Sequence, residues 1–198
     1  MTYTINSYFG AKVVAGDTGF FLNNEMDDFT AKPGAANMFG LVQGAANAIQ
    51  PGKRPLSSMS PTIALRDGKV FLIVGSPGGP RIITAVLETI SNVVDHGMSV
   101  SEAVDAPRIH HQWLPDVIYA EPMALSPDTA RLLTEMGYKI TQQPPWGAAE
   151  TILVGPQSAT GKTAEGAIDD SSQGGFAKSG ALYGANDARR PAGAAIGN

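Results

Sequence analysis

Two apolar, β-rich runs separated by a turn dipeptide are the clearest feature of the hydropathy pattern. Residues 62–66 (TIALR) and 69–74 (KVFLIV) flank Asp67-Gly68. Val, Ile and Phe suit a pleated strand, and Asp-Gly readily adopts the positive φ angles of a two-residue hairpin turn. The pattern therefore predicts a β-hairpin over residues 62–74.

A hairpin brings the segments before and after it close together. Two adjacent hydroxyls, Ser57 and Ser58, precede this hairpin, and the glycine pair Gly78-Gly79 follows it. Hydroxyls and free backbone N–H groups suit the binding of an anion or the stabilisation of an oxyanion. We therefore expect a pocket formed by the two serines and the two glycines. The structural alternative is that the glycines only allow a helix to pack tightly on a sheet.

Three helices are predicted by apolar residues that recur every three or four positions and by capping residues. Pro80 suits the first position of the first helix, and Ser99 with Glu102 forms a capping box at the start of the second. Gly97 and Gly137 are expected to end the first and the third helix. The predicted ranges are 80–96, 99–106 and 126–136.

The remaining pattern predicts short strands, loops and an insertion. Residues 30–54 have no clear period, which is typical of a long surface loop that acts as a lid or a binding loop. Residues 156–180 are rich in Gly, Ser, Ala and Thr and are interpreted as a flexible insertion between two paired strands. Strands and helices together favour an α+β layered fold. The predicted strands are 2–9, 12–15, 117–120, 139–142, 151–154 and 181–184, and the predicted division of the chain is a core (1–155), the insertion (156–180) and a C-terminal strand and tail (181–198).

Composition excludes several classes of function. The chain has 198 residues, 43% of them hydrophobic, which suffices for the core of one domain. The net charge of −4 and the scattered Lys and Arg argue against a nucleic-acid partner. No apolar run reaches membrane-spanning length, the first residues do not resemble a signal peptide, and no Cys is present for a disulfide or a thiolate metal site.

Two motifs are weak on inspection. The segment 155–163 resembles a phosphate-binding loop, but five residues separate Gly155 from Gly161 where the motif needs four, and Pro156 has no N–H to donate. His110 and His111 offer metal ligands or a base, but adjacent residues of an extended segment point to opposite faces. We expect one of these histidines to be packed and the other exposed. Neither a metal site nor a cofactor is predicted.

The acidic segment at residues 25–28 has two possible interpretations. Glu25, Asp27 and Asp28 form either a solvated acidic turn or a binding site, and their spacing lacks the oxygen ladder of a calcium loop. One structural hypothesis pairs this turn with arginines, namely Arg54, Arg81 and Arg108. The residues alone reveal no nucleophile with a base beside it, since there is no Gly-x-Ser-x-Gly elbow.

Five segments, taken in order, closely resemble motifs of the small subunit of the γ-glutamyltranspeptidases. The resemblance covers most of residues 2–155, with a weaker match at 182–185. The segments are 2–6 (TYTIN), 23–29 (NNEMDDF), 53–62 (KRPLSSMSPT), 75–79 (GSPGG) and 106–115 (APRIHHQWLP).

The resemblance implies an αββα sandwich of the N-terminal nucleophile hydrolase type. In that family a precursor cuts itself into a large and a small subunit, and the new N-terminal Thr attacks the γ-glutamyl carbonyl of glutathione or a related compound. The γ-glutamyl group then passes to water or to an amino acid or peptide. The implied partners are a large subunit of the same precursor and a γ-glutamyl compound, and the implied location is periplasmic or extracellular.

The resemblance also implies roles for individual residues. Gly78 and Gly79 match the glycines of the oxyanion hole, and Ser57 and Ser58 match serines that hold the α-carboxylate of the substrate. The other matches are Glu25 and Asp28 (α-ammonium), Asn6 (the glutamyl head), Thr4 (orientation of the nucleophile) and Phe39 (in a lid, residues 35–45, where many bacterial members carry Tyr).

This sequence departs from the family pattern at its start. In the family, the small subunit opens with the catalytic Thr and a short strand, and the segment that matches Thr2 comes after them. This sequence starts after that point, and neither Thr2 nor Thr4 can replace the nucleophile. We therefore expect a partial sandwich that lacks the first strand and the large-subunit layers. We also expect this chain to be catalytically inactive when alone. A non-catalytic glutamyl-binding companion subunit is one alternative. The second alternative is an acylase of the same superfamily that acts on another amide. Glu25, Asp28, Ser57 and Ser58 disfavour it, because they match residues that bind an α-amino acid head.

Overall fold

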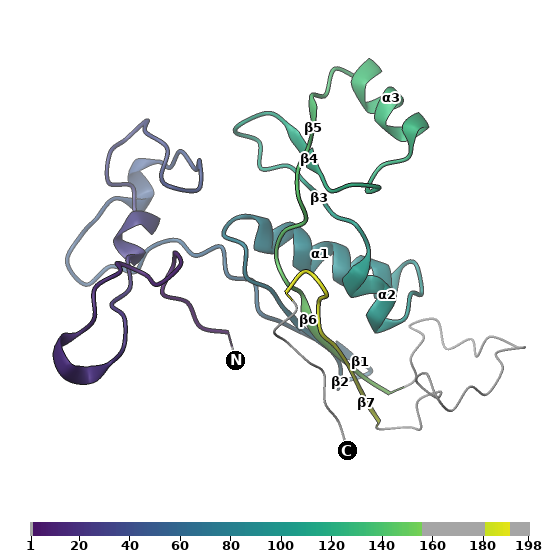
Figure 1. Cartoon of the computed structure of the whole chain (residues 1–198), viewed down its shortest axis with the longest axis horizontal. Coiled ribbons are helices and arrows are strands. Elements are labelled where there is room, and N and C mark those ends of the chain that lie inside the picture. The colour runs from purple at the N-terminus through teal and green to yellow at the C-terminus, as the bar shows by residue number, and fades with distance from the viewer. Residues whose placement is uncertain (1, 156–180, 191–198) are drawn as a thin grey trace, which may run out of the picture.

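Two sheets and three α-helices, with three short 3₁₀ turns, make up the helices and strands of the described residues (Figure 1). The computed structural model describes residues 2–155 and 181–190. The larger sheet is antiparallel, in the order β1 (Thr62–Arg66), β2 (Lys69–Gly75), β6 (Glu150–Val154) and β7 (Leu182–Ala185). In the smaller sheet, β4 (Ile118–Ala120) pairs with β3 (Ile109–His110) in antiparallel and with β5 (Ile140–Gln142) in parallel orientation.

The β1–β2 hairpin confirms the prediction from the hydropathy pattern. Its turn residues Asp67 and Gly68 have φ angles of 51° and 74°. Two consecutive positive φ angles characterise the type I′ turn, whose twist matches that of the flanking strands. The pairing of Thr62 with Val74 then places the segments before β1 and after β2 at the same end of the sheet.

Helices α1 (Arg81–Val94) and α2 (Val100–Asp105) pack on one face of the larger sheet. The core joins Leu72 and Leu153 of the sheet to Val93, Val100 and Val104 of the helices. The capping box of α2 is complete, since Ser99 Oγ accepts from the Glu102 N–H and the Glu102 carboxylate accepts from the Ser99 N–H. The third helix, α3 (Pro127–Glu135), is capped by Ser126 and lies beyond the smaller sheet with no buried residue (Figure 1).

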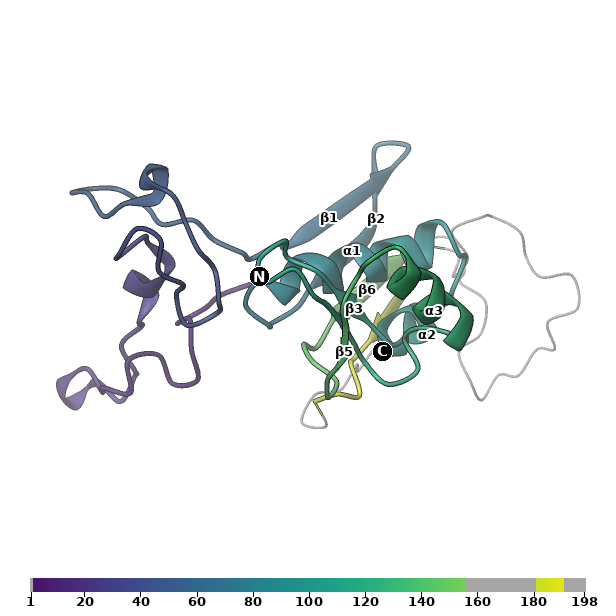
Figure 2. The same ribbon diagram turned by 90° about the horizontal axis from the view of Figure 1, so that it is seen from above.

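The first sixty residues form an irregular arm beside the larger sheet (Figure 2). The predicted loop 30–54 is confirmed as irregular, with one short 3₁₀ turn. The predicted strands 2–9 and 12–15 are wrong: the first bends at Asn6, whose φ is 75°, and the second makes only the single bridge Val14–Phe21. Alternating residues form a strand only where a neighbouring strand accepts their hydrogen bonds, and no described strand runs alongside them. The 3₁₀ turns are η1 (Gly16–Thr18), η2 (Glu25–Asp28) and η3 (Ala45–Asn47).

The remaining predicted elements agree with the structure to within a few residues, and β7 pairs with β6 as expected. Pro80 precedes α1 as its N-cap residue rather than occupying its first helical position. The predicted insertion 156–180 lies outside the described residues.

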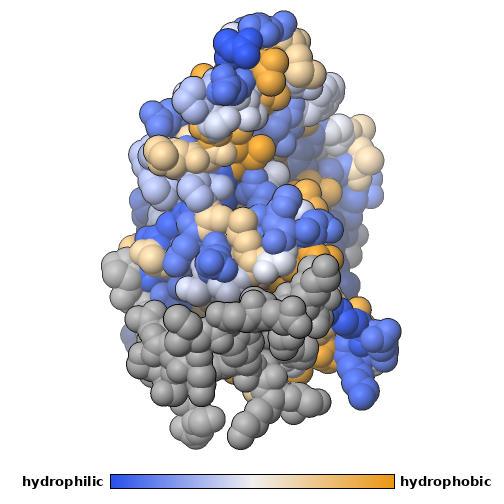
Figure 3. Space-filling model, turned by 90° about the vertical axis from the view of Figure 1, so that its right-hand side faces the viewer, coloured by the Kyte–Doolittle hydropathy of each residue, from blue (hydrophilic) through white to orange (hydrophobic). Residues whose placement is uncertain are grey.

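The face of the larger sheet opposite the helices is apolar and exposed. Ile63, Ile73 and Ile152 are direct cross-strand neighbours on β1, β2 and β6, with 65%, 36% and 39% of their surfaces exposed. Leu65 on β1 and Leu182 on β7 are also exposed, by 62% and 69%. The right-hand side of the molecule, by contrast, carries hydrophilic and hydrophobic residues intermixed (Figure 3).

Candidate functional site

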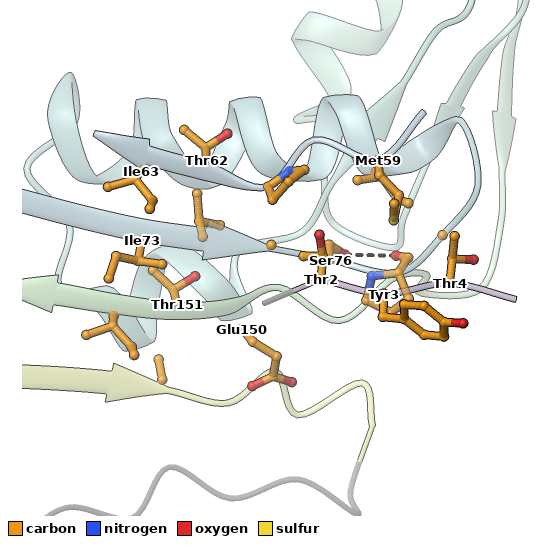
Figure 4. A pocket seen from close by; sticks show the side chains of 18 of the residues that line it. Thr2, Tyr3, Thr4, Met59, Thr62, Ile63, Ile73, Ser76, Glu150 and Thr151 are labelled. Atoms are coloured by element: carbon orange, nitrogen blue, oxygen red, sulfur yellow. Dashed lines mark hydrogen bonds between the residues drawn. The ribbon is translucent and has the colours of Figure 1, made fainter. Parts of the chain in front are cut away.

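An open cavity of about 1480 Å³ lies along the exposed sheet face and reaches the glycine turn that follows β2. In Figure 4, the segment Thr2 to Thr4 runs past the end of β2 beside Ser76, and Ile63 and Ile73 lie further along the sheet. Every residue to which the resemblance assigned a role lines this cavity except Glu25. The lining members of that set are Thr4, Asn6, Asp28, Phe39, Ser57, Ser58, Gly78 and Gly79.

The glycine turn presents free amide groups at the start of a helix. Gly78 and Gly79 have φ angles of 143° and 59°, which favour glycine. Their carbonyl oxygens accept from the N–H groups of Arg81 and Ile82, while neither glycine N–H donates to another described residue. The two amides at the N-terminus of α1 are therefore available to an anion.

The serine pair precedes β1, at the same end of the hairpin as the glycine turn, and lines the same cavity. Ser57 Oγ accepts from the Met59 N–H over 3.2 Å, which fixes the turn that carries the pair. Ser58 is half-buried, and its hydroxyl has no hydrogen-bond partner within the described segments. Both hydroxyls retain the capacity to donate to a carboxylate.

The acidic turn brings Asp28 to the cavity. Its backbone carbonyl accepts from Gln43 Nε2 over 3.2 Å and from Asn47 Nδ2 over 2.7 Å, so the long loop holds the turn in place. Burial, followed by the nearby carboxylates of Glu25 and Asp27, raises the pKa of Asp28 above its usual value. A partly buried anion with anionic neighbours gains stability when a cation binds.

The N-terminal segment is tied to this turn. The Asn6 N–H donates to Thr4 Oγ1 over 2.8 Å, and Asn6 Nδ2 donates to the Asn24 carbonyl over 3.2 Å. Asn24 directly precedes η2, so these contacts bring Thr4 and Asn6 to the wall that carries Asp28.

The predicted lid contacts both the acidic turn and the glycine turn. Asp27 Oδ2 accepts from the Met38 N–H over 3.1 Å, and Asn37 Oδ1 accepts from the Phe39 N–H over 3.0 Å. The Phe39 ring covers Gly79 so closely that a Cβ atom on this glycine would lie 2.8 Å from Cδ1 of the ring. The lid therefore rests on one of the two candidate oxyanion-binding glycines.

Comparison with known proteins decides the family. The family model described as gamma-glutamyltranspeptidase matches residues 1–179. The chain belongs to the γ-glutamyltranspeptidase family.

Two bacterial relatives show how much of a family member this chain covers. It is 52% identical over 197 residues to the glutathione hydrolase proenzyme of Pseudomonas sp. (strain A14), covering 100% of this chain and 32% of the relative. It is 55% identical over 156 residues to the glutathione hydrolase proenzyme of Escherichia coli (strain K12), covering 79% of this chain and 27% of the relative. The chain thus spans a third or less of the length of these curated relatives.

A solved γ-glutamyltranspeptidase has the same fold. The T380A mutant of the Helicobacter pylori enzyme superimposes with a TM-score of 0.82 and 50% identity, over 96% of this chain and 92% of that one. The predicted α+β fold is confirmed, and the chain forms part of the αββα sandwich of the N-terminal nucleophile hydrolases.

Sequence reasoning missed a buried ion network beside the site. The hypothesis that Arg108 pairs with the acidic turn is wrong, because its Nη2 donates to Asp187 Oδ2 over 2.7 Å. Asp187 also pairs with Arg189, which in turn pairs with Glu121. Burial acts to raise the pKa of Asp187, but hydrogen bonds from the Arg189 and Ala149 N–H groups and from Arg108 outweigh it and lower the pKa. The network fixes the segment after β7 against β4 and β6.

The histidine pair behaves as expected. His110 is buried and lies 2.9 Å from Thr84 Oγ1 through Nδ1, while His111 is exposed and lies 3.0 Å from Asp116. Burial is the main cause that lowers the pKa of His110. Within residues 2–155 and 181–190, no group of three or more His, Asp or Glu is arranged to hold a metal ion. The weak phosphate-loop motif lies outside the described residues, apart from Gly155.

None of the helices in the described part of the chain is long and apolar enough to cross a membrane.

Proposed function

We propose that this chain supplies the γ-glutamyl pocket and the oxyanion hole of an enzyme that cleaves γ-glutamyl amides such as glutathione. In this proposal the enzyme transfers the γ-glutamyl group to water or to an amino acid or peptide. The observation that carries the proposal is the convergence of Asp28, Ser57, Ser58, Gly78 and Gly79 on one cavity, although they come from three separate segments.

The chemistry of these residues matches the parts of a γ-glutamyl substrate. The glutamyl head is a zwitterion, so the Asp28 carboxylate suits its ammonium, and the hydroxyls of Ser57 and Ser58 suit its carboxylate. When a nucleophile attacks the γ-carbonyl, its oxygen becomes negative, and the N–H groups of Gly78 and Gly79 stabilise that charge. In the proposed reaction the attacking hydroxyl is that of the family's catalytic Thr, and Thr4 orients it. Asn6 contacts the glutamyl head, and Glu25, outside the cavity wall, adds a second negative charge that attracts the ammonium group.

We also propose that a large subunit of the same precursor covers the exposed face of the larger sheet. Two observations support this partner: the row of exposed Ile and Leu side chains on that face, and the far greater length of the relatives. Burial of such a face stabilises a complex by roughly 25 cal/mol per Å² of apolar surface. A periplasmic or extracellular location is proposed from the family resemblance.

The test is turnover of γ-glutamyl-p-nitroanilide by the protein produced from its full-length gene. The double variant Ser57→Ala/Ser58→Ala is expected to raise KM for this donor at least about tenfold, because two hydrogen bonds to a charged group are lost. Ser91→Ala is the matched control, since Ser91 lies on α1 and bonds to Asp95 away from the cavity.

Two outcomes would contradict the proposal. Binding of glutamate without any turnover would favour the non-catalytic companion subunit. Faster hydrolysis of amides that lack an α-amino acid head would favour the acylase.

A further inference from the structure

The two amides of the glycine turn are oriented by the carbonyl groups that precede them. A trans peptide unit is planar, so its C=O and N–H groups point in opposite directions. A hydrogen bond to the carbonyl on one side therefore fixes the direction of the N–H group on the other side. The bonds Pro77–Gly78 and Gly78–Gly79 are both trans.

Helix α1 fixes the amide of Gly79. The Gly78 carbonyl belongs to the same peptide unit as the Gly79 N–H, and it accepts from the Arg81 N–H over 3.3 Å. Because Arg81 is the first residue of α1, the helix itself directs the Gly79 N–H away from its N-terminal end.

The amide of Gly78 has no such support from the helix. It shares its peptide unit with the carbonyl of Pro77, to which no backbone N–H of the described residues donates. The hydroxyl of Ser76 donates to this carbonyl instead, over 2.8 Å (Figure 4). The side chain of Ser76 is therefore the group that orients the Gly78 N–H.

The neighbours of Ser76 leave its hydroxyl proton one direction. Ser76 Oγ lies 3.2 Å from the backbone nitrogen of Ala148, whose N–H can only donate. A hydroxyl has one proton and can also accept. Since Oγ accepts from Ala148, its proton is available to the Pro77 carbonyl, which can only accept. The two hydrogen bonds are thus compatible and form together.

The segment around Ala148 is held by the buried ion network. The Ala149 N–H donates to Asp187 Oδ2 over 2.8 Å, and the Trp146 carbonyl accepts from Arg108 Nη1 over 2.9 Å. Ala148 is itself only 2% exposed. The N–H group that supports the serine hydroxyl is therefore fixed in position.

Gly147 allows this segment to approach the glycine turn closely. Its φ angle is 76°, and a Cβ atom on it would lie 3.1 Å from Ser76 Oγ and 3.4 Å from the Pro77 carbonyl oxygen. The two segments thus contact each other directly, with the serine hydroxyl between them.

We propose that Ser76 is a positioning residue for the oxyanion hole. Its hydroxyl, held by the Ala148 N–H, orients the Gly78 N–H toward the negative oxygen of the tetrahedral intermediate. The inference rests on the proposed function, in which the two glycine amides stabilise that oxygen. Formation and breakdown of the acyl-enzyme both pass through an oxyanion at this place, so Ser76 supports both steps.

The first test is the steady-state kinetics of Ser76→Ala in the enzyme produced from its full-length gene, with γ-glutamyl-p-nitroanilide as the donor. Removal of an oxyanion donor lowers kcat about 100- to 1000-fold, so loss of its orientation is expected to lower kcat at least about tenfold. KM is expected to stay within about twofold, because both chemical steps slow together and the residues that bind the glutamyl head are unchanged. Ser91→Ala removes a hydroxyl that bonds to Asp95 on α1, and it should change neither constant.

Ser76→Thr assigns the effect to the hydroxyl. Threonine keeps one donor and one acceptor at this position, so it is expected to recover most of the lost kcat. A kcat as low as that of Ser76→Ala would overturn the assignment.

The second test distinguishes the orientation of one amide from a general disturbance of the pocket. It compares two inhibitors of donor hydrolysis. One is the boronic acid analogue of glutamate, in which boron replaces the γ-carboxyl carbon, bonds to the nucleophile oxygen and becomes a tetrahedral anion. The other is L-norvaline, which has the same amino acid head and chain length but no γ-oxygen.

Only the tetrahedral inhibitor places a negative oxygen against the glycine amides. In Ser76→Ala its inhibition constant is expected to rise at least about tenfold, while that of L-norvaline stays within about twofold. Equal weakening of both inhibitors would show a purely structural role and overturn the inference.

The outcomes separate this inference from the proposed function. An unchanged kcat in Ser76→Ala, with turnover by the unmodified enzyme, would overturn the role of Ser76 alone. Absence of turnover by the unmodified enzyme would contradict the proposed function, and the role of Ser76 with it.

Discussion

Arg108 and Asp187 lie 79 positions apart in the chain, yet Nη2 of the first donates to Oδ2 of the second over 2.7 Å. Only 2% and 0% of their side chains are exposed. Arg108 also donates to the carbonyl oxygens of Val104 and Trp146, so one guanidinium ties α2, the segment before β6 and the segment after β7 together.

Replacement of Asp187 by Ala is therefore expected to be strongly destabilising. It leaves the Arg108 charge buried without its carboxylate, and removal of one partner from a buried pair typically costs about 3–5 kcal/mol. The free energy of unfolding in urea measures the effect. Arg131→Gln breaks the exposed pair with Glu135 and should cost no more than about 0.5 kcal/mol. A similar small loss in Asp187→Ala would contradict the structural role assigned to the pair.

Replacement of Gly79 by Ala is expected to displace the lid. The added Cβ would lie 2.8 Å from the Phe39 ring at a residue whose φ is 59°. We expect kcat/KM for a γ-glutamyl donor to fall at least about tenfold, and the further change Phe39→Ala to recover part of it by removing the clash. Gly52→Ala is the control, because Gly52 has a similar φ of 72° with no atom near the added Cβ. An equal loss in Gly52→Ala would mean that backbone strain, not the lid contact, is responsible.

The affinity for the donor is expected to depend on pH through Asp28. Its carboxyl must be ionised to hold an ammonium group, and burial together with Glu25 and Asp27 raises its pKa. KM should therefore rise as the pH falls, beginning at a higher pH than an ordinary Asp would allow. Asp27→Asn removes one of the neighbouring charges and should shift this rise to lower pH. An identical pH profile in Asp27→Asn would show that another group controls the rise.

Stability is expected to depend on pH through Glu88 on α1. Burial raises its pKa to about 7 from 4.5, one carboxylate oxygen accepts from the Ile109 N–H, and the other has no partner in the described structure. Between these two pKa values the folded state holds a proton that the unfolded state has lost. Glu88 therefore favours folding below about pH 4.5, and this contribution disappears as the pH rises through about 7.

Glu88→Gln is expected to flatten this dependence. The melting temperature of the variant should exceed that of the unmodified protein at pH 8, and the difference should shrink toward pH 5. Glu135→Gln, at an exposed position on α3, provides the control. A constant difference across this pH range would show that Glu88 does not titrate as the structure indicates.

The local features of this fold were predictable because short-range chemistry decides them. The turn at Asp67-Gly68 and the capping box of Ser99 depend on residues within three positions of each other. The hairpin in turn predicts that Ser57 and Ser58 lie near Gly78 and Gly79. Phe39, in contrast, was found only through the family resemblance, because an aromatic residue in an irregular loop gives no local signal.

Features that depend on distant partners were not predictable in this way. The alternation at residues 2–9 resembles a strand, but β-structure requires a neighbour that the pattern of one segment cannot reveal. The same limit applies to Arg108, for which the sequence analysis offered the acidic turn at residues 25–28 as a partner. Its actual partner, Asp187, follows an apolar strand as a single acidic residue, and nothing in the periodicity marks it.

The separation of Arg108 and Asp187 by 79 positions also has a consequence for biosynthesis. A ribosome adds Arg108 long before Asp187 and β7, so during translation the growing chain holds a guanidinium destined for the interior without its counter-ion. Folding of the larger sheet around this charge must wait until Asp187 and β7 have emerged from the ribosome. Premature termination upstream of Asp187 would therefore yield not a smaller folded protein but a substrate for the cell's proteases.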